Sequence, residues 1–177
     1  MILCDFQIKA EIERGTLKIS PFDESLINPS SLDVRLGQSF YRPEPTYVNI
    51  DPTDPLSFRS HKVADTTYVL KPGEFVISSL LEHITLPSDI SSSLRGKSSL
   101  ARLGLDNSSF GAWIDPGFSG SLVIELANHS KFPLVLTKGM KIGQLIFYKH
   151  VKAAQDYSQR ESSKYMNQRG VQPSKGV

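Results

Sequence analysis

Hydrophobic and polar residues alternate over much of the chain, and this period of two is typical of half-buried β-strands. Near residue 30, Leu32, Val34 and Leu36 alternate with polar neighbours. Longer stretches of this kind occupy 67–87, 121–130 and 132–150. Pro72-Gly73 and Lys138-Gly139 interrupt them and are typical turn residues. Short strands joined by such turns predict a mainly β protein with a compact barrel or jelly-roll-like body.

Two stretches show helical spacing instead. Residues 5–14 predict one short N-terminal helix, because two isoleucines lie four positions apart there. Asp5 is the expected N-cap, and Gly15 is the expected end of that helix. The sequence SSLARLGL at 98–105 predicts a second short helix inside the β region.

The C-terminal stretch 158–177 is polar and nearly free of large aliphatic residues. Composition alone predicts a disordered tail there, and the alternative is a segment that orders over a bound ligand. The sequence thus predicts one β domain over 1–150, with 151–177 as a flexible C-terminal segment of the same domain.

Composition and charge narrow the class of protein. The chain has 177 residues, of which 39% are hydrophobic, which is enough for one domain with a real core. Its 20 Lys and Arg face 18 Asp and Glu, so a net charge of +2 gives no reason to expect nucleic acid as a partner. No apolar run approaches the roughly 20 residues of a membrane helix, and charges stand too early for a signal peptide. We therefore expect a soluble, cytoplasmic protein with no membrane association.

Cysteine and histidine counts exclude one kind of chemistry. The chain has one Cys and four scattered His, so it can form no internal disulfide. A zinc deaminase needs a His-x-Glu and a Pro-Cys-x-x-Cys pattern, and neither is present. We expect no zinc site.

The run AWIDPGFSGSLVIEL at 112–126 carries a carboxylate near each end, Asp115 and Glu125. Asp115-Pro116-Gly117 is typical of a tight turn, so Asp115 is expected at the end of a strand. There it either caps the turn or faces a site.

Strand parity predicts where Glu125 points. Leu122, Ile124 and Leu126 share one face of the predicted strand, whereas Val123 and Glu125 share the other. Glu125 is then either a solvated residue on a half-exposed strand or a pocket carboxylate whose pKa is tuned for proton transfer.

The stretch LRGKSSLARLGL places cations beside hydroxyl groups at a predicted helix start. Its polar residues are Arg95, Lys97, Ser98, Ser99 and Arg102. Such a group can form a cradle for phosphate, or it can be a solvated basic turn. It is not a Walker A loop, because the Gly-x4-Gly-Lys spacing is absent.

Several separated motifs, in order, resemble the dCTP deaminase branch of the dUTPase/dCTP deaminase superfamily. They are PSSLDVRLG, GKSSLARLGL, WIDPGFSGSLVIEL, GMKIGQLIF and SKYMNQRG, and the likeness extends to about Gly170. The resemblance implies a dUTPase-like distorted β-barrel or jelly-roll, with a short N-terminal helix and a C-terminal lid. It also implies a homotrimer with sites between subunits, and zinc-independent hydrolysis of the 4-amino group of dCTP.

The resemblance assigns catalytic roles by motif. It makes Glu125 the general base, which takes a proton from the water that attacks C4. Ser98 and Arg102 would hold that water and the phosphates, with Lys97 and Ser99 completing the cradle. Asp115 would bind the 3′-hydroxyl of the sugar.

Further contacts follow from the same resemblance. The remaining expected substrate-binding positions are Leu100, Ala101, Val123, Ile124, Gln144, Tyr157, Lys164 and Gln168. Of these, the tail residues Tyr157, Lys164 and Gln168 match the closing segment over the triphosphate. Mg²⁺ is expected only through the substrate triphosphate, whose hard oxygens suit it.

The resemblance also bears on the product. Monofunctional enzymes carry Arg two residues before the motif Asp, whereas this chain has Ala112-Trp113 there. An aromatic residue at that position, and Gln144, match the bifunctional type, which releases dUMP and diphosphate for dTMP synthesis. Asp115 would then also orient the water that attacks the α-phosphate. The alternatives are a monofunctional enzyme that releases dUTP and, in another class, a nucleotide-sensing regulatory protein.

One short segment departs from the family pattern. The family has Thr-Ala-Gly before the aromatic-Ile-Asp motif, whereas this chain has Phe110-Gly111-Ala112. In the family, that stretch lies beside the base and relays inhibition by dTTP. The departure leaves regulation by dTTP, and a preference for modified cytosine, open.

Overall fold

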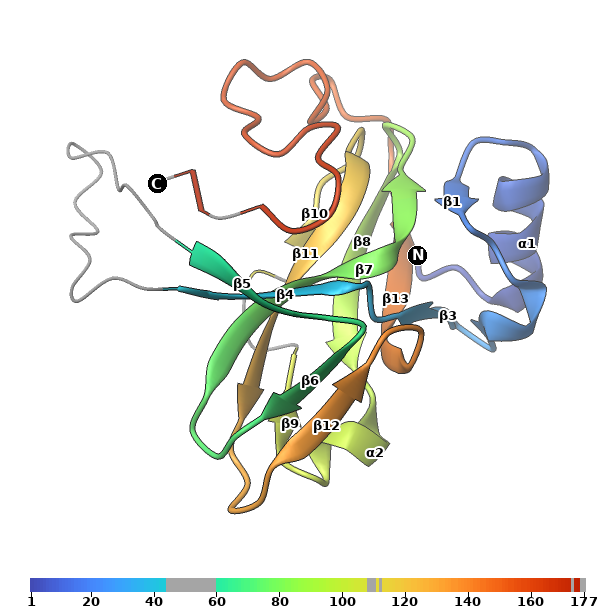
Figure 1. Ribbon diagram of the computed structural model, residues 1–177. Coiled ribbons are helices and arrows are strands. Elements are labelled where there is room, and N and C mark those ends of the chain that lie inside the picture. Colours follow the sequence, from blue (N-terminus) through green and yellow to red (C-terminus); the bar gives the residue numbers. More distant parts are fainter. Residues whose placement is uncertain (44–59, 108–110, 112, 173, 176–177) are drawn as a thin grey trace.

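The computed structural model describes residues 1–43, 60–107, 111, 113–172 and 174–175, and Figure 1 shows it as a ribbon. The helical elements are α1 (Asp5–Glu13), η1 (Glu24–Leu26) and α2 (Ser98–Ala101). The strands are β1 (Lys18–Ser20), β2 (Ile27–Asn28), β3 (Ser31–Arg35), β4 (Ser39–Pro43), β5 (Ser60–Asp65), β6 (Thr67–Leu70), β7 (Phe75–Thr85), β8 (Ile90–Gly96), β9 (Leu105–Asp106), β10 (Trp113–Ile114), β11 (Ser119–Asn128), β12 (Leu134–Thr137) and β13 (Lys141–Lys149).

Helix α1 forms where the sequence predicts it, but the prediction of Asp5 as its N-cap is wrong. The N-cap is Cys4, which has an extended backbone and whose N–H donates to Gln7 Oε1 at 3.1 Å. Asp5 is already the first helical residue, and its N–H donates to the Pro29 carbonyl at 3.1 Å. Gly15, at φ +72, follows the end of the helix as expected.

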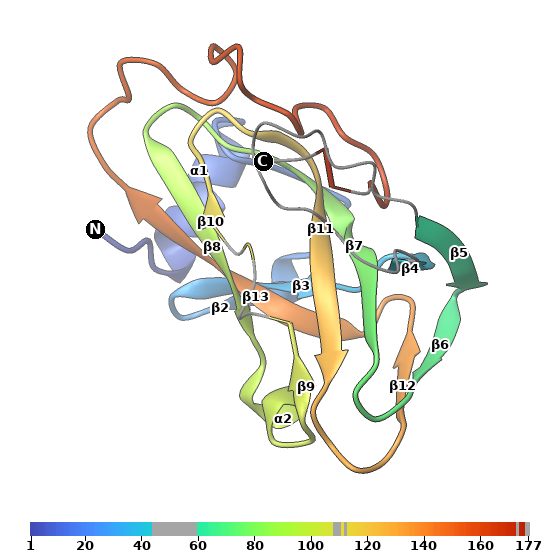
Figure 2. The same ribbon diagram turned by 90° about the vertical axis from the view of Figure 1, so that its left-hand side faces the viewer.

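Two larger sheets and one two-stranded sheet form the body. One sheet has the order β5-β4-β7-β11-β9, with β1 also paired to β7, and the other has the order β10-β8-β13-β3-β2. Strands β6 and β12 pair separately, in antiparallel register. Figures 1 and 2 show the long strands β7, β11, β8 and β13 at the centre. The mainly β architecture agrees with the alternating sequence pattern.

The core lies between the two larger sheets. Strand β11 alternates strictly between half-buried and buried positions, and Ile124 and Leu126 are on its buried face. Leu32 and Phe147 contribute from the other sheet and are also fully buried. The parity predicted for this strand is confirmed, and Glu125 therefore points away from the core.

Beyond β13 the described part of the chain runs without regular secondary structure across the upper end of β11 (Figures 1 and 2). Backbone hydrogen bonds join Tyr157 N to Pro116 O at 2.8 Å and Asn167 N to Ser119 O at 2.7 Å. Gly117, at φ +82, lies under this segment, and a Cβ there would collide with the Asp156 side chain. Glycine is thus required at this position for two reasons, the positive φ and the close approach of the Asp156 side chain.

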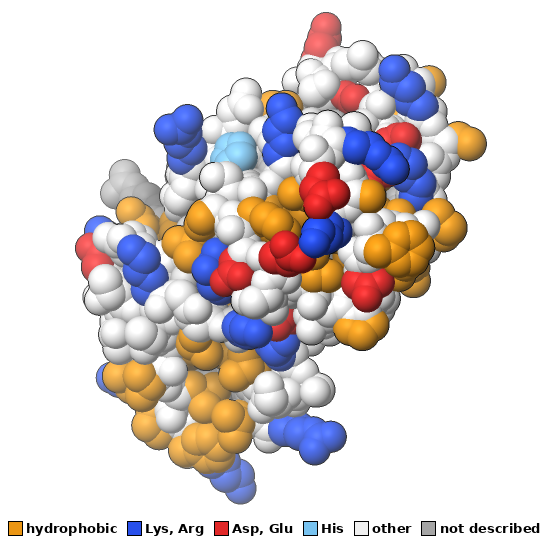
Figure 3. Space-filling model, turned by 90° about the vertical axis from the view of Figure 1, so that its right-hand side faces the viewer, with side chains coloured by type: hydrophobic (Ala, Val, Ile, Leu, Met, Phe, Trp, Pro, Cys, Tyr) orange, Lys and Arg blue, Asp and Glu red, His pale blue; other side chains and the backbone are white. Residues whose placement is uncertain are grey.

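The side of the molecule that carries α1 mixes the two signs of charge. Figure 3 shows acidic and basic side chains interspersed with apolar ones across this face. Among the described residues, no helix is long and apolar enough to cross a membrane. The cytoplasmic location stays a prediction.

Candidate functional site

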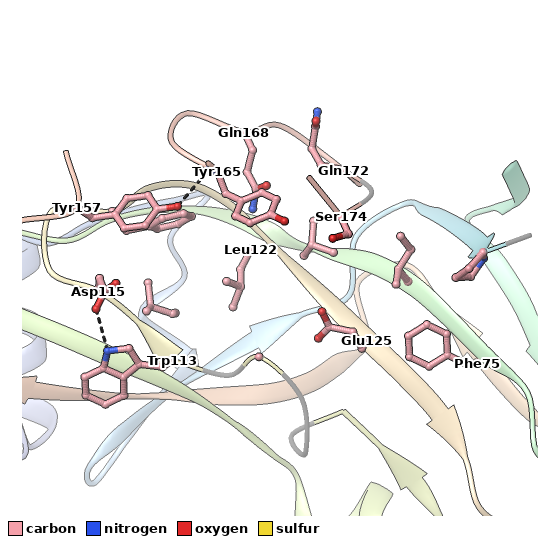
Figure 4. Close-up of a pocket in the computed structure, with 16 residues that line it drawn as sticks. Phe75, Trp113, Asp115, Leu122, Glu125, Tyr157, Tyr165, Gln168, Gln172 and Ser174 are labelled. Carbon is pink, nitrogen blue, oxygen red and sulfur yellow. Dashed lines mark hydrogen bonds between the residues drawn. The ribbon is translucent and has the colours of Figure 1, made fainter. Parts of the chain in front are cut away.

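A cavity of about 390 Å³ lies between the outer face of β11, strand β10 and the C-terminal segment. It is lined by Pro43, Phe75, Ile77, Gly111, Trp113, Ile114, Asp115, Phe118, Leu122, Val123, Glu125, Tyr157, Tyr165, Gln168, Gln172 and Ser174. Figure 4 shows the layout, with Asp115 and Trp113 at one side, Glu125 and Phe75 at the other, and the tail residues above. Of the described residues that line it, two are carboxylates and none is Lys or Arg.

Glu125 enters the cavity from β11 because strand parity turns it away from the core. Its cross-strand partner on β7 is Ile77, and Phe75 lies next along the same cavity wall. Burial among these groups raises the pKa of the Glu125 carboxyl, and its own backbone N–H offsets only part of this. A carboxylate so placed is a stronger base than one in water.

Asp115 stands where β10 ends and the tight turn begins, as the Asp-Pro-Gly sequence predicts. Its carbonyl accepts from Phe118 N at 3.3 Å, which closes the turn. Its side chain does not cap the turn, because the Trp113 indole N–H donates to Oδ1 at 3.1 Å instead. The Trp113 ring packs on Tyr148 with centroids 5.6 Å apart, so the donor is held by β13.

The C-terminal segment supplies the roof of the cavity. Gln168 is pinned to β11 because its carbonyl accepts from Ser121 N at 2.9 Å and its Nε2 donates to Ser121 O at 2.8 Å. This donation fixes the amide orientation, and Gln168 Oε1 is then buried with no partner among the described residues. Tyr157 packs edge-on against Phe118 and accepts a hydrogen bond from Tyr165 N at 3.0 Å.

The predicted phosphate cradle lies elsewhere in the same chain. Helix α2 contacts β9 at the lower end of the molecule in both ribbon views, opposite to the tail. Ser98, Ser99, Ala101 and Arg102 are exposed, and Leu100 is half-buried. None of them lines the cavity.

Lys97, the N-cap of α2, is held by a buried carboxylate. Its Nζ lies 2.6 Å from Oδ1 of Asp33 on β3. Asn28 Nδ2 donates to the same oxygen at 2.9 Å, and Lys141 Nζ lies 3.2 Å from Oδ2. Burial alone would raise the pKa of the Asp33 carboxyl, but these three donors together hold it below its ordinary value.

A family model described as dCTP deaminase-like matches residues 2–150. The chain belongs to the dCTP deaminase-like family. The chain is 44% identical over 171 residues to "dCTP deaminase, dUMP-forming" of Methanoculleus marisnigri, covering 95% of this chain and 91% of that protein. It is 48% identical over 181 residues to the protein of the same name from Rhodococcus erythropolis, covering 99% and 96%.

A solved structure extends the comparison to the fold. It is the 2′-deoxycytidine 5′-triphosphate deaminase from Agrobacterium tumefaciens, which matches with a TM-score of 0.66 and 31% identity over 82% of this chain. The chain spans only 47% of that longer chain. The likenesses confirm the family resemblance and the mainly β, dUTPase-like fold class predicted from the sequence.

With family membership established, the predicted site residues of this dCTP deaminase-like chain fall into two groups. The cavity brings together Trp113, Asp115, Val123, Glu125, Tyr157 and Gln168. The α2 residues, Lys97 and Gln144 stand apart from it, and Ala112 and Phe110 lie outside the described residues. Gln144 on β13 accepts from Ser31 Oγ at 2.9 Å, and the Lys164 side chain is exposed. Ile124 faces the core, so only its backbone is available to a ligand.

The cavity also contains residues that the sequence reasoning missed. Phe75 and Ile77 reach it only through the register of β7 against β11, which no spacing in the sequence reveals. Tyr165 lies in the SKYMNQRG motif, so a signal for it was present. Within the described residues, no three His, Cys, Asp or Glu side chains gather as a metal site.

Proposed function

We propose that this protein is a dCTP deaminase that forms dUMP, releasing ammonia and diphosphate. The main observation in support is that Glu125 and Asp115, ten residues apart, line one cavity roofed by the C-terminal segment. The names of the relatives point to the same reaction. The product dUMP would serve dTMP synthesis.

In the deamination step, Glu125 acts as the general base. It accepts a proton from the water whose oxygen bonds to C4 of the cytosine, and it passes protons to N3 and to the departing amino group. The C4–N bond then breaks and ammonia leaves. The raised pKa of Glu125 favours this role, because a base works best when its pKa approaches the pH of the reaction.

In the second step, Asp115 orients the water that attacks the α-phosphate, and the bond to the β-phosphate breaks. Trp113 supports this role, since its indole N–H fixes one oxygen of the carboxylate. The aromatic ring therefore contributes a directed donor and not only an apolar surface. Gln168 Oε1, which is buried and unpartnered among the described residues, is suited to accept from a donor group of the nucleotide.

A triphosphate needs positive charge, and the cavity lining among the described residues offers none. The exposed α2 cradle with Ser98 and Arg102 offers it at the other end of the chain. A homotrimer with sites between subunits would bring one chain's cradle to another chain's cavity. Mg²⁺ would be held by the phosphate oxygens, because Asp115 and Glu125 do not form a protein cage for it.

Product analysis tests the reaction. The protein is incubated with dCTP and Mg²⁺, and nucleotides are separated early in the reaction. We expect dUMP and diphosphate in equal amounts, with little dUTP. Accumulating dUTP without diphosphate would leave a monofunctional deaminase, and unchanged dCTP would favour a nucleotide-sensing protein.

Mixed oligomers test the shared site. Glu125→Gln and Arg102→Ala chains are each expected to be inactive alone. When they are unfolded and refolded together, some sites combine an intact cavity with an intact cradle, so activity should return. Failure of the mixture to regain activity, with both variants folded and trimeric, would place the whole site within one chain.

A further inference from the structure

Arg160 in the C-terminal segment contacts the site although no motif singled it out. Its Nη1 lies 3.8 Å from Oδ2 of Asp115. Trp113 holds the other oxygen, Oδ1, at 3.1 Å. The two oxygens of one carboxylate thus have different partners, one from β10 and one from the tail.

This arrangement determines the orientation of the carboxylate plane. The backbone of Asp115 is fixed by its turn, but the terminal torsion of an Asp side chain is broad, so the contacts of its two oxygens decide how the carboxylate is turned. A single donor at Oδ1 restrains one oxygen and leaves rotation about that contact. A cation near Oδ2 restricts this rotation further, because it favours the orientations that keep Oδ2 close to the guanidinium.

The ion pair adds little to folding. The two side chains are 50% and 39% exposed, and exposed pairs of this kind contribute roughly 0–1 kcal/mol. Their position matters more than their strength. Tyr157, three residues before Arg160, is bonded to Pro116 of the same turn, so the tail is anchored beside Asp115.

We propose that Arg160 is a positioning residue for Asp115, which couples docking of the C-terminal segment to the orientation of that carboxylate. This inference rests on the proposed function, in which Asp115 directs water to the α-phosphate. Deamination depends on Glu125 at the other side of the cavity, so the two steps respond differently when Arg160 is lost. The guanidinium also offsets the negative charge of Asp115 next to an anionic nucleotide.

The test is the product ratio of Arg160→Gln, measured with dCTP and Mg²⁺. We expect the variant to release dUTP where the unaltered protein releases dUMP, with diphosphate release lowered about tenfold or more. Misplacement of a reacting group by roughly 1 Å can cost ~10²-fold. Arg160→Lys keeps the charge and should restore part of the dUMP yield. Lys152→Gln removes another exposed cation of the same segment, eight residues before Arg160, and should leave the ratio unchanged.

The outcomes separate this inference from the proposed function. If the unaltered protein forms dUMP and Arg160→Gln gives the same ratio of dUTP to dUMP, Arg160 does not position Asp115. An equal loss of both products in Arg160→Gln would also overturn the inference and indicate phosphate binding instead. If the unaltered protein does not deaminate dCTP at all, the proposed function itself fails. Thermal unfolding of each variant should match the unaltered protein within about 1 kcal/mol.

Discussion

Asp33 on β3 and Glu125 on β11 are carboxylates withdrawn from water, yet they differ in what surrounds them. Asp33 is 3% exposed and receives donors from Lys97, Lys141 and Asn28. Glu125 lies in a cavity against Phe75 and Ile77, and no other described side chain donates to it. Burial acts in the same direction on both pKa values, but only Asp33 has enough donors to reverse it.

The difference separates a structural carboxylate from a chemical one. The pKa of Asp33 is lowered, so its ionised form stabilises the fold and its proton is hard to restore. The pKa of Glu125 is raised, so its ionised form is held at a cost to folding and is ready to take a proton. Such a cost is typical of functional sites.

The largest effect expected is on catalysis when Glu125 becomes Gln. The amide keeps the shape of the side chain but accepts no proton, and a general base contributes typically 10²–10⁴-fold. Deamination should therefore fall at least about a hundredfold, while dCTP binding measured by calorimetry stays largely intact. Glu74, the residue just before β7, is also a carboxylate but does not line the cavity, so Glu74→Gln is the control. Retention of more than about a hundredth of the rate would rule out general-base catalysis by Glu125.

The next effect is on stability, when Asp33 becomes Asn. The change leaves Lys97 and Lys141 without their shared partner, although both reach solvent in part. We expect a loss of about 2–3 kcal/mol at neutral pH, because hydrogen bonds to charged groups contribute roughly 1.5–3 kcal/mol. Urea unfolding measures it.

The pH dependence checks the cause of that loss. A lowered pKa means that Asp33 stabilises the fold above its ordinary pKa and loses this contribution as the pH falls through its lowered, folded value. The difference between the unaltered protein and Asp33→Asn should therefore shrink toward strongly acidic pH. A difference that does not depend on pH would assign the loss to packing.

The local alternation of hydrophobic and polar residues predicts the strands around the site, but it does not predict which strands pair with each other or in which register. The alternation along 121–130 predicts that Glu125 and Ile124 point to opposite faces of the strand, and the structure confirms this prediction. The ion pair of Lys97 and Asp33 joins residues that are 64 positions apart. The sequence pattern identifies Asp33 only as a polar position in an alternating strand and gives no sign of this partner. Register between strands depends on the whole sheet, so contacts of this kind cannot be derived from spacing.

The C-terminal segment is a second case in which the sequence pattern alone does not predict the contacts. Its polar composition alone predicts disorder, because it has few groups to bury. The structure holds it by backbone hydrogen bonds to Ser119 and Ser121 and by the Tyr157 ring on Phe118. Backbone bonds leave no trace in composition, so only the SKYMNQRG resemblance indicated that the segment belongs to the site. Its action as a lid stays a prediction.

A smaller effect, of opposite sign, is expected on stability in Glu125→Gln. Because its pKa is raised in the folded state, Glu125 contributes to stability below its ordinary pKa and loses that contribution as the pH rises through the raised value. Removing the charge should therefore increase the free energy of unfolding at pH 8 by up to about 1 kcal/mol. The gain should vanish below the ordinary pKa of Glu. Lower stability at pH 8 would mean that the ionised carboxylate has a partner.

The smallest effect expected is that of Lys141→Met, which removes one of the two cations at Asp33. Lys141 is the more exposed of the pair, at 51% against 26% for Lys97, and its contact with Asp33 is longer, at 3.2 Å against 2.6 Å. Water and salt screen such a charge, so the loss should be below about 1 kcal/mol and should shrink further in 1 M salt. Lys97 and Asn28 still bond Oδ1, so the pKa of Asp33 should stay below its ordinary value, as read from the acid limb of the unfolding curve. If this variant instead lost as much stability as Asp33→Asn, Lys141 would be the main partner, and Lys97 would be free to act with the α2 cradle.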